Sequence, residues 1–221
     1  MFVPLRPSQE ALDATSKLEA TIRDKLLRNC VQAIIILGQD RNPIKRQELN
    51  KLAFPTVNYR VAAAIVQEAN KELNKTFGMR LYELEDKTRY LLINSKTDFA
   101  DLMNHSEAMC NELAVLYFVL IDIFVAPDER LSEDEIEASL RPLNLTRDET
   151  KSYLDSFTKR LYLRMDKHQE SRTFSWGPRA VAEVDPESFF NSFLYLVKDS
   201  SDKNWPDLKT RINNLKSIPN R

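Results

Sequence analysis

The chain presents the same order of secondary-structure signals twice, and this internal repeat limits the fold more than any other feature. Glu48-Leu49 in the first half and Glu135-Ile136 in the second half lie 87 positions apart, each within a short helix signal. In both halves a long apolar helix precedes that signal, and an amphipathic helix and two β-type runs follow it. The pattern predicts one supersecondary unit that occurs in tandem.

Three helix signals and a hairpin signal make up the first half. The expected helices cover residues 16–37, 42–52 and 58–78, and the expected strands flank a polar turn at 85–87. The first helix begins with a capping box, Ser16 with Glu19. The second helix is expected to have Asn42 at its cap and Pro43 in its first position. Gly78 marks the end of the third helix.

The second half repeats these signals with stronger capping. Its segments are an apolar helix at 111–126, helices at 131–143 and 146–160, and two β-type runs within 161–176. Ser132 with Glu135 and Thr146 with Glu149 form two capping boxes. Three helices followed by a hairpin define a winged helix. The predicted fold class is therefore mainly α with small β-hairpin wings (α+β), arranged as tandem winged-helix domains.

The repeat also predicts the domain organisation. We expect an N-terminal tail at 1–14, a first winged-helix unit at 15–98, a second unit at 99–200, and a C-terminal helix and tail at 201–221. The boundary between the two units is expected within 94–106. Two further helices are expected near the C-terminus, at about Pro186 to Lys198 and Trp205 to Leu215.

Composition indicates an ordinary folded protein. Hydrophobic residues make up 43% of the 221, and 32 basic residues balance 33 acidic ones, which gives a net charge of -1. Overall charge therefore gives no reason to expect an anionic partner. No apolar run approaches the roughly 18 residues of a membrane span, and the N-terminus does not resemble a signal peptide. We expect a soluble cytosolic or nuclear protein without membrane contact.

Residues suited to catalysis or metal binding are few. Cys30 and Cys110 lie in apolar helical segments, so buried thiols are expected rather than a disulfide. His105 and His168 lie in polar segments without a nucleophile motif, and the four residues together lack the paired spacing of a zinc site. The three glycines are isolated, which excludes a glycine-rich phosphate loop. We expect no enzyme activity, no cofactor and no metal.

Two helices contain more apolar residues than a single buried face requires, since a globular helix needs only about a 100° apolar face. The candidate partner-binding residues on them are Ile34, Ile35, Ile36, Leu37, Tyr117, Phe118 and Phe124. Either a partner protein or the other half of the chain could cover these side chains. An apolar groove that takes an amphipathic helix or a peptide is a common recognition mode.

Basic residues gather around the third helix and the wing of the second unit. The candidate DNA-binding residues are Lys151, Lys159, Arg160, Arg164, Lys167 and Arg172. Asp155, Asp166 and Glu170 partly offset them, so a solvated charged face is the alternative. The corresponding helix of the first unit alternates basic and acidic residues and has little net attraction for phosphate. If duplex DNA binds, we expect it to bind weakly and without sequence preference, through the basic residues of the second unit.

Three motifs, in order, resemble those of the MAGE homology domain family. The apolar helix and the Pro-initiated helix after it read AIIILGQDRNPIKRQEL, and the first wing reads TFGMRLYELEDKTRYLLIN. The second wing, LYLRMDKHQESRTFSW, ends in the family signature WGPRA, which is complete at Trp176 to Ala180. The resemblance spans roughly Ile22 to Lys198 and is most like the MAGE-type non-SMC subunit of the DNA-repair structural maintenance of chromosomes complex.

The resemblance implies a non-enzymatic scaffold that binds a RING-type ubiquitin ligase subunit and a kleisin subunit and contributes to DNA binding. In the family, adjacent leucines at the positions matching Ile34, Ile35 and Ile36 contribute to the RING-partner surface. A nuclear, chromatin-associated location is expected, with the cytoplasm as an alternative. Two other functions stay open: a stand-alone tandem winged-helix DNA-binding regulator, and a MAGE-type adaptor for an unrelated RING ligase.

The signature itself is expected to join the last wing strand to a short closing helix. Trp176 is expected to pack beneath the wing, Gly177 to provide a conformationally permissive turn, and Pro178 to start the helix. For Arg179 we expect a buried anchor that hydrogen-bonds carbonyls or a carboxylate, with a ligand contact as the alternative.

Overall fold

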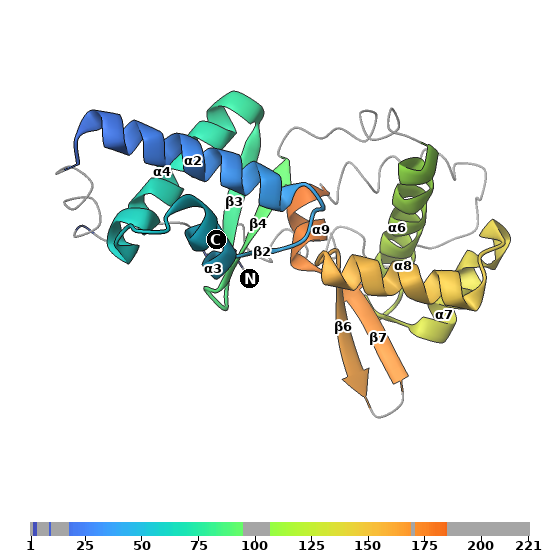
Figure 1. Cartoon of the computed structure of the whole chain (residues 1–221). Coiled ribbons are helices and arrows are strands. Elements are labelled where there is room, and N and C mark those ends of the chain that lie inside the picture. The colour runs from blue at the N-terminus through green and yellow to red at the C-terminus, as the bar shows by residue number, and fades with distance from the viewer. Residues whose placement is uncertain (1, 4–8, 10–17, 95–106, 169–170, 185–221) are drawn as a thin grey trace. The chain divides into compact units, whose positions relative to one another are not determined.

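The computed structural model describes residues 2–3, 9, 18–94, 107–168 and 171–184 (Figure 1). These residues form two compact units, and the division falls between positions 96 and 97. We call the part up to Asn94 unit 1 and the part from Glu107 unit 2. The expected Ser16 cap, the expected C-terminal helices and all the predicted domain boundaries lie outside the described residues, so the predicted organisation stays a prediction.

In its described residues, unit 1 contains a four-stranded antiparallel sheet, two helices of 19 residues and one of 8 residues. Its elements are β1 (Phe2–Val3), α2 (Ala20–Gly38), β2 (Ile44–Lys45), α3 (Arg46–Ala53), α4 (Tyr59–Phe77), β3 (Met79–Leu84) and β4 (Arg89–Asn94). The strand order is β1-β3-β4-β2. Apolar faces of α2, α3 and α4 meet the inner face of the sheet in one core, which includes fully buried Ile34, Leu49 and Ile65.

The α4 helix has the ends that the sequence predicts. The Asn58 side chain accepts a hydrogen bond from the Arg60 backbone N–H at 2.9 Å, which satisfies one of the first free N–H groups. Gly78 ends the helix at φ 66°, in the left-handed region where glycine lacks the penalty of a side chain. The helix therefore leads directly into β3.

The second helix begins later than predicted. Pro43 does not start it: Ile44 and Lys45 form β2, which pairs with Tyr90 and Arg89 of β4, and α3 begins at Arg46. Ile44 is 2% exposed, so its burial beneath the wing outweighs the local capping signal at Asn42. The first helix also differs at its start, since α2 begins at Ala20 without a side-chain cap.

The outer edge of β3 is closed in two ways. The Asn70 amide accepts a hydrogen bond from the Leu81 N–H at 2.7 Å and donates one to the Leu81 carbonyl at 3.0 Å. One step further along the strand, Val3 of β1 pairs with Glu83. An amide side chain and a two-residue strand together occupy backbone groups that would otherwise accept another chain.

Unit 2 repeats this plan with a shorter third helix. Its elements are α6 (Glu107–Val125), β5 (Leu131–Ser132), α7 (Glu133–Leu140), a 3-10 turn (Arg141–Leu143), α8 (Arg147–Lys159), β6 (Leu163–His168), β7 (Ser171–Trp176) and α9 (Pro178–Glu183). The strand order is β5-β7-β6. Both predicted capping boxes are confirmed, Ser132 with Glu135 and Thr146 with Glu149.

One core fills unit 2. It is formed by side chains of α6, α7, α8, the β6–β7 hairpin and α9, among them Leu120, Phe157 and Phe174, which are all at most 1% exposed. In the described residues each unit therefore has three helices before a hairpin and its own core, and unit 2 adds the short helix α9 after the hairpin. The predicted fold class, mainly α with small β-hairpin wings in tandem winged helices, is confirmed.

Candidate functional site

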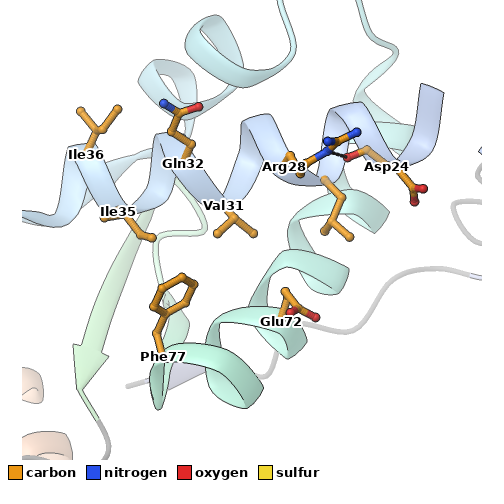
Figure 2. A pocket seen from close by; sticks show the side chains of 9 residues that line it. Asp24, Arg28, Val31, Gln32, Ile35, Ile36, Glu72 and Phe77 are labelled. Carbon is orange, nitrogen blue, oxygen red and sulfur yellow. Dashed lines mark hydrogen bonds between the residues drawn. The ribbon is translucent and has the colours of Figure 1, made fainter. Parts of the chain in front are cut away.

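An open groove of about 740 Å³ lies on unit 1 between α2 and α4 (Figure 2). Its lining residues are Asp24, Leu27, Arg28, Val31, Gln32, Ile35, Ile36, Glu72 and Phe77. The groove has the size of a small-molecule or side-chain pocket, which typically measures about 300–1,000 Å³. Its lining consists mainly of apolar side chains at one end and charged side chains at the other.

The predicted apolar run on α2 divides between the core and this groove. Ile34 is fully buried in the core of unit 1, so its side chain offers no surface to a partner. Ile35 lines the groove and is half-buried, and Ile36 lines it while 50% exposed. Leu37 packs at the edge of the core. A helix places successive residues about 100° apart, so a run of four apolar residues cannot share one face.

Phe77, in the last position of α4, is the groove residue that the sequence analysis missed. Its ring is 48% exposed, and Figure 2 shows it directed from α4 toward Ile35 on α2. The sequence offered one signal for it: a large aromatic residue stands between the polar stretch Asn74 to Thr76 and the helix-ending Gly78. Exposed aromatic residues of this kind are enriched at protein interfaces.

Charged residues mark the other end of the groove. Asp24 and Glu72 line it on α2 and α4, and the Arg28 side chain, also on α2, donates a hydrogen bond to the Asp24 carbonyl at 3.3 Å. Nearby, Arg23 and Glu68 join the two helices through an ion pair of 2.6 Å. A ligand of this groove would therefore place apolar side chains against Ile35, Ile36 and Phe77, with polar groups at the opposite end.

The predicted apolar residues of α6 also divide. Phe124 is 2% exposed and lies in the core of unit 2, where its ring centroid is 6.2 Å from that of Trp176. Tyr117 is half-buried and packs against the same core. Phe118 is 49% exposed, so within unit 2 it is the member of the predicted set that presents most of its ring at the surface.

The six predicted DNA-binding residues do not form one basic patch. Lys151, Lys159, Arg164 and Lys167 are exposed. The remaining two arginines are held in ion pairs. Arg160 pairs with Glu112 of α6 at 2.7 Å. Arg172 pairs with Glu133 at 2.5 Å and with Asp155 at 2.6 Å.

The Arg172 ion pairs have an electrostatic consequence. The hydrogen bond from Arg172 lowers the pKa of the Glu133 carboxyl, and the same carboxylate holds the guanidinium in place. The two carboxylates of Glu133 and Asp155 offset the positive charge of Arg172, so this group attracts a distant phosphate little. Of the six predicted residues, Lys151, Lys159, Arg164 and Lys167 are therefore the ones with exposed side chains outside these ion pairs.

The WGPRA signature is part of the core of unit 2. The Trp176 indole donates a hydrogen bond to the Leu120 carbonyl at 2.9 Å, which confirms the expected position beneath the wing. Pro178 begins α9, as expected. Gly177 has an ordinary φ of -87°, so the expected permissive turn is wrong. Glycine is required by space instead: a Cβ atom there would lie 2.4 Å from the Leu161 carbonyl oxygen.

Arg179 is a buried anchor, as expected. It is 1% exposed, donates to the Arg160 carbonyl at 2.9 Å, and forms an ion pair with Glu183 at 2.8 Å. Its guanidinium lies 5.6 Å from the centroid of the Tyr162 ring, and the Tyr162 hydroxyl donates to the second Glu183 oxygen at 2.5 Å. These contacts join the end of α8, the start of β6 and α9.

The predicted absence of catalytic and metal chemistry stays a prediction. Within the described part of the chain no group of three or more metal-ligating side chains comes together. Cys30 is buried, and burial raises the pKa of its thiol to about 12, far from the range of a reactive thiolate. The Cys110 and His168 side chains and His105 lie outside the described residues. None of the described helices is long and apolar enough to cross a membrane.

Comparisons with known proteins match most of the chain. A model of the MAGE homology domain family matches residues 30–187. The human protein MAGE-like protein 2 is 26% identical over 217 residues, which cover 90% of this chain and 17% of the human protein. The chain therefore spans less than a fifth of the length of that relative. A chain of the solved Nse1-Nse3-Nse4 complex superposes with a TM-score of 0.73 at 20% identity, covering 90% of this chain and 99% of that one.

Proposed function

Because the chain belongs to the MAGE homology domain family, we propose that it is a non-enzymatic scaffold subunit of the DNA-repair structural maintenance of chromosomes complex. In this role it binds a RING-type ubiquitin ligase subunit and a kleisin subunit, and it supports ligase activity and DNA association. The similarity to a chain of the Nse1-Nse3-Nse4 complex supports a multi-subunit assembly of this kind. The protein is then nuclear and chromatin-associated, with a cytoplasmic pool as a second location.

The observation that supports this proposal best is the apolar end of the groove on unit 1. Ile36 and Phe77 are each about half exposed, 50% and 48%, and both border the same hollow as Ile35. Apolar side chains that gather at one exposed groove are typical of a binding site for a protein partner. We propose that this groove binds the RING-type subunit, since the family resemblance implies a contact on the same segment of α2.

The kleisin subunit is assigned to unit 2. Phe118 and Tyr117 lie on α6, and Phe118 is the more exposed of the two. An amphipathic helix of the partner could cover such a ring in the way that helices bind apolar grooves. Phe124 and Ile34 leave the predicted set, because both are core residues.

DNA association is proposed as a weaker, additional property. It rests on the exposed side chains of Lys151, Lys159, Arg164 and Lys167. Phosphate contacts from lysine and arginine bind without sequence preference and weaken steeply as salt rises. Arg160 and Arg172 contribute to structure rather than to this contact, because carboxylates already pair with them.

Co-expression tests the scaffold role. The chain is expressed with candidate RING-type and kleisin subunits, and size-exclusion chromatography measures whether they co-elute. Ile36→Asp and Phe77→Asp should abolish co-elution with the RING-type subunit without a change in melting temperature, because both side chains are at the surface. Leu52→Asp is the matched control, since Leu52 is 53% exposed on α3, outside the groove.

Each other outcome favours a different function. Undiminished co-elution of both groove variants would contradict the assignment of the groove. A chain that elutes alone beside both partners, yet shifts duplex DNA at physiological salt, would instead be a stand-alone DNA-binding regulator. Co-elution with an unrelated RING ligase alone would indicate the adaptor role. Ubiquitin transfer measured with and without the chain tests the support of ligase activity.

The DNA contact has its own test. Lys159→Glu combined with Arg164→Glu should weaken binding to duplex DNA. It should also reduce the slope of log affinity against log salt concentration by about two, because two phosphate contacts are lost. Lys75→Glu on α4 of unit 1 changes the same kind of exposed charge elsewhere and should have no effect. An unchanged affinity of the double variant would remove unit 2 from the DNA contact.

A further inference from the structure

The backbone of β6 has one side that faces β7 and one that faces outward. Gly177 donates its N–H to the Tyr162 carbonyl at 2.7 Å, so position 162 faces the hairpin partner. Inward and outward positions alternate along an antiparallel strand. Positions 164, 166 and 168 therefore bond to β7, and the N–H and C=O groups of Leu163, Met165 and Lys167 point outward.

The two units differ at this edge. In unit 1 the corresponding outward groups of β3 are occupied by the Asn70 amide at Leu81 and by β1 at Glu83. In the described part of unit 2, neither a strand nor a side chain hydrogen-bonds to the outward backbone groups of Met165 or Lys167. The β6 edge thus has the same geometry as β3, but among the described residues it has neither of the two covers found on β3.

The side chains along β6 indicate which segment fits there. Met165 pairs across the hairpin with buried Phe174 and is itself 37% exposed, so it offers an apolar contact beside the edge. Arg164 and Lys167 are exposed, whereas the Asp166 carboxylate is paired with Arg130 at 3.3 Å. The edge therefore combines unused backbone donors and acceptors with an excess of positive charge.

We propose that the outer edge of β6 binds an extended acidic peptide segment of a partner protein, which adds to the sheet as a further strand. Main-chain hydrogen bonds to Met165 and Lys167 provide the affinity. Acidic side chains beside Arg164 and Lys167 and an apolar side chain on Met165 provide the selectivity. The site is on unit 2 and does not depend on the groove of unit 1. It shares Arg164 and Lys167 with the DNA contact proposed above but does not depend on that contact.

Two other molecules that could bind the β6 edge, a second copy of the chain and duplex DNA, fit it less well. A second copy of the chain would bring an equally basic β6 to the edge, and like charges on paired strands are destabilising. Duplex DNA could pair its phosphates with Lys167 and with outward N–H groups. It could not satisfy the outward carbonyls, however, because phosphate oxygens are acceptors only. An acidic peptide alone matches both the charges and the alternating donors and acceptors.

The test selects displayed random peptides of about eight residues, within the usual strand length of about 3–10 residues, against the full-length chain. We expect enrichment of acidic peptides with alternating apolar residues. Met165→Pro removes one outward N–H but no bond to β7, and proline is tolerated on an edge in this position. It should reduce the affinity of a selected peptide about tenfold or more. Met165→Val keeps the N–H and should bind nearly as well as the parent chain.

Further measurements separate the alternatives. Hydrogen exchange should show a fast Met165 amide in the free chain and a protected one with peptide present, and duplex DNA affinity should be equal for Met165→Pro and the parent. An amide already protected in the free chain would overturn the proposal, as would equal peptide binding by Met165→Pro at unchanged melting temperature. Selection of basic or patternless peptides, or β6-dependent dimerisation, would overturn it as well.

Discussion

The two units connect the third helix to the wing in different ways. In unit 1, α4 ends at Gly78, whose φ of 66° lies in the left-handed region. In unit 2, the same turn of the backbone is made by Leu161, also at φ 66°. A left-handed conformation costs a residue with a side chain about 1–2 kcal/mol more than it costs glycine. Unit 2 must therefore gain stability elsewhere, and α9 provides it.

The supporting contacts converge on Leu161. Its carbonyl accepts a hydrogen bond from the Arg179 backbone N–H at 3.0 Å, and Gly177 lies directly against it. The Arg179 side chain binds the carbonyl of Arg160, the preceding residue. Unit 1 thus makes this turn with Gly78 alone. Unit 2 makes it with Leu161, and the WGPRA signature stabilises the left-handed conformation of that leucine.

The largest effect is expected from removing the Arg179 side chain. Arg179→Ala leaves the mostly buried Glu183 carboxylate without its cation and the Arg160 carbonyl without its donor, at a site where Arg179 is 1% exposed. We expect a loss of about 3 kcal/mol of stability. In a Trp205→Phe background, Trp176 is the only tryptophan and reports the melting of unit 2.

Arg179→Lys is the control for this change, because it keeps a positive charge but not the planar donor set. It should recover only part of the loss. Amide hydrogen exchange in unit 1 should stay the same. If Arg179→Ala melts like the parent chain and instead loses a partner, Arg179 is an interface residue rather than an anchor of the joint.

A smaller but still large effect is expected for Gly177→Ala. The new methyl group would lie 2.4 Å from the Leu161 carbonyl oxygen and 2.8 Å from the Tyr162 carbonyl carbon, and both are backbone atoms with little freedom to move. We expect destabilisation by about 2–3 kcal/mol. Gly38→Ala provides the contrast, since its nearest neighbour is the Leu92 side chain, which can shift. Equal effects of the two variants would show that the joint is loosely packed.

The unit 1 joint should be less sensitive. Gly78→Ala places a side chain at φ 66° and should destabilise unit 1 by about 1 kcal/mol. Gly78→Asn should cost less, because asparagine tolerates the left-handed region. Chemical denaturation followed by hydrogen exchange separates unit 1 from unit 2. A loss as large as that of Gly177→Ala would remove the difference between the joints.

The smallest difference concerns acid. In unit 2 the Arg172 hydrogen bond lowers the pKa of Glu133, and capping-box hydrogen bonds lower the pKa of Glu135 and Glu149. A carboxyl with a lowered pKa stabilises the fold above its unfolded value of about 4.3, and this stability is lost as the pH falls through the folded pKa. In unit 1, Asp86 has a lowered pKa too, where burial opposes the shift and hydrogen bonds prevail.

Burial raises the pKa of Asp122 in unit 2, which acts in the opposite direction, so the three lowered carboxyl pKa values of unit 2 are partly offset. Because three lowered values still stand against one raised value, unit 2 should lose more stability than unit 1 between neutral pH and pH values below about 4. Denaturation with hydrogen exchange at both pH values measures this. Glu135→Gln should reduce the difference, because it removes one titrating group from the comparison. Identical acid sensitivity in both units would contradict the assignment.

Local signals predicted most of the elements because they act over one helical turn. The capping boxes at Ser132 and Thr146 and the stop at Gly78 each involve neighbouring residues, so the sequence displays them directly. The repeat then predicted the winged helices. The start of α3 failed because its cause is tertiary: Ile44 pairs with Tyr90, far along the chain.

The candidate site was harder to predict for the same reason. The apolar run on α2 indicated a surface, but only the packing of α4 determines that Ile36 and Phe77 meet across a groove while Ile34 is buried. The basic residues counted around α8 included Arg160 and Arg172, whose acidic partners are distant in sequence. Residue type predicts charge, whereas pairing depends on the fold.

The Asn70 amide has a consequence for how the protein ages. Its NH₂ group donates to the Leu81 carbonyl, and its oxygen accepts from the Leu81 N–H. Deamidation to aspartate would keep the acceptor but turn the donor into a second oxygen, which repels that carbonyl. The strand edge would then open at Leu81, while β1 still pairs with Glu83, and exposed edges are starting points for aggregation. Slow chemical change at a single amide could thus limit the storage life of the purified protein, without any change in its core.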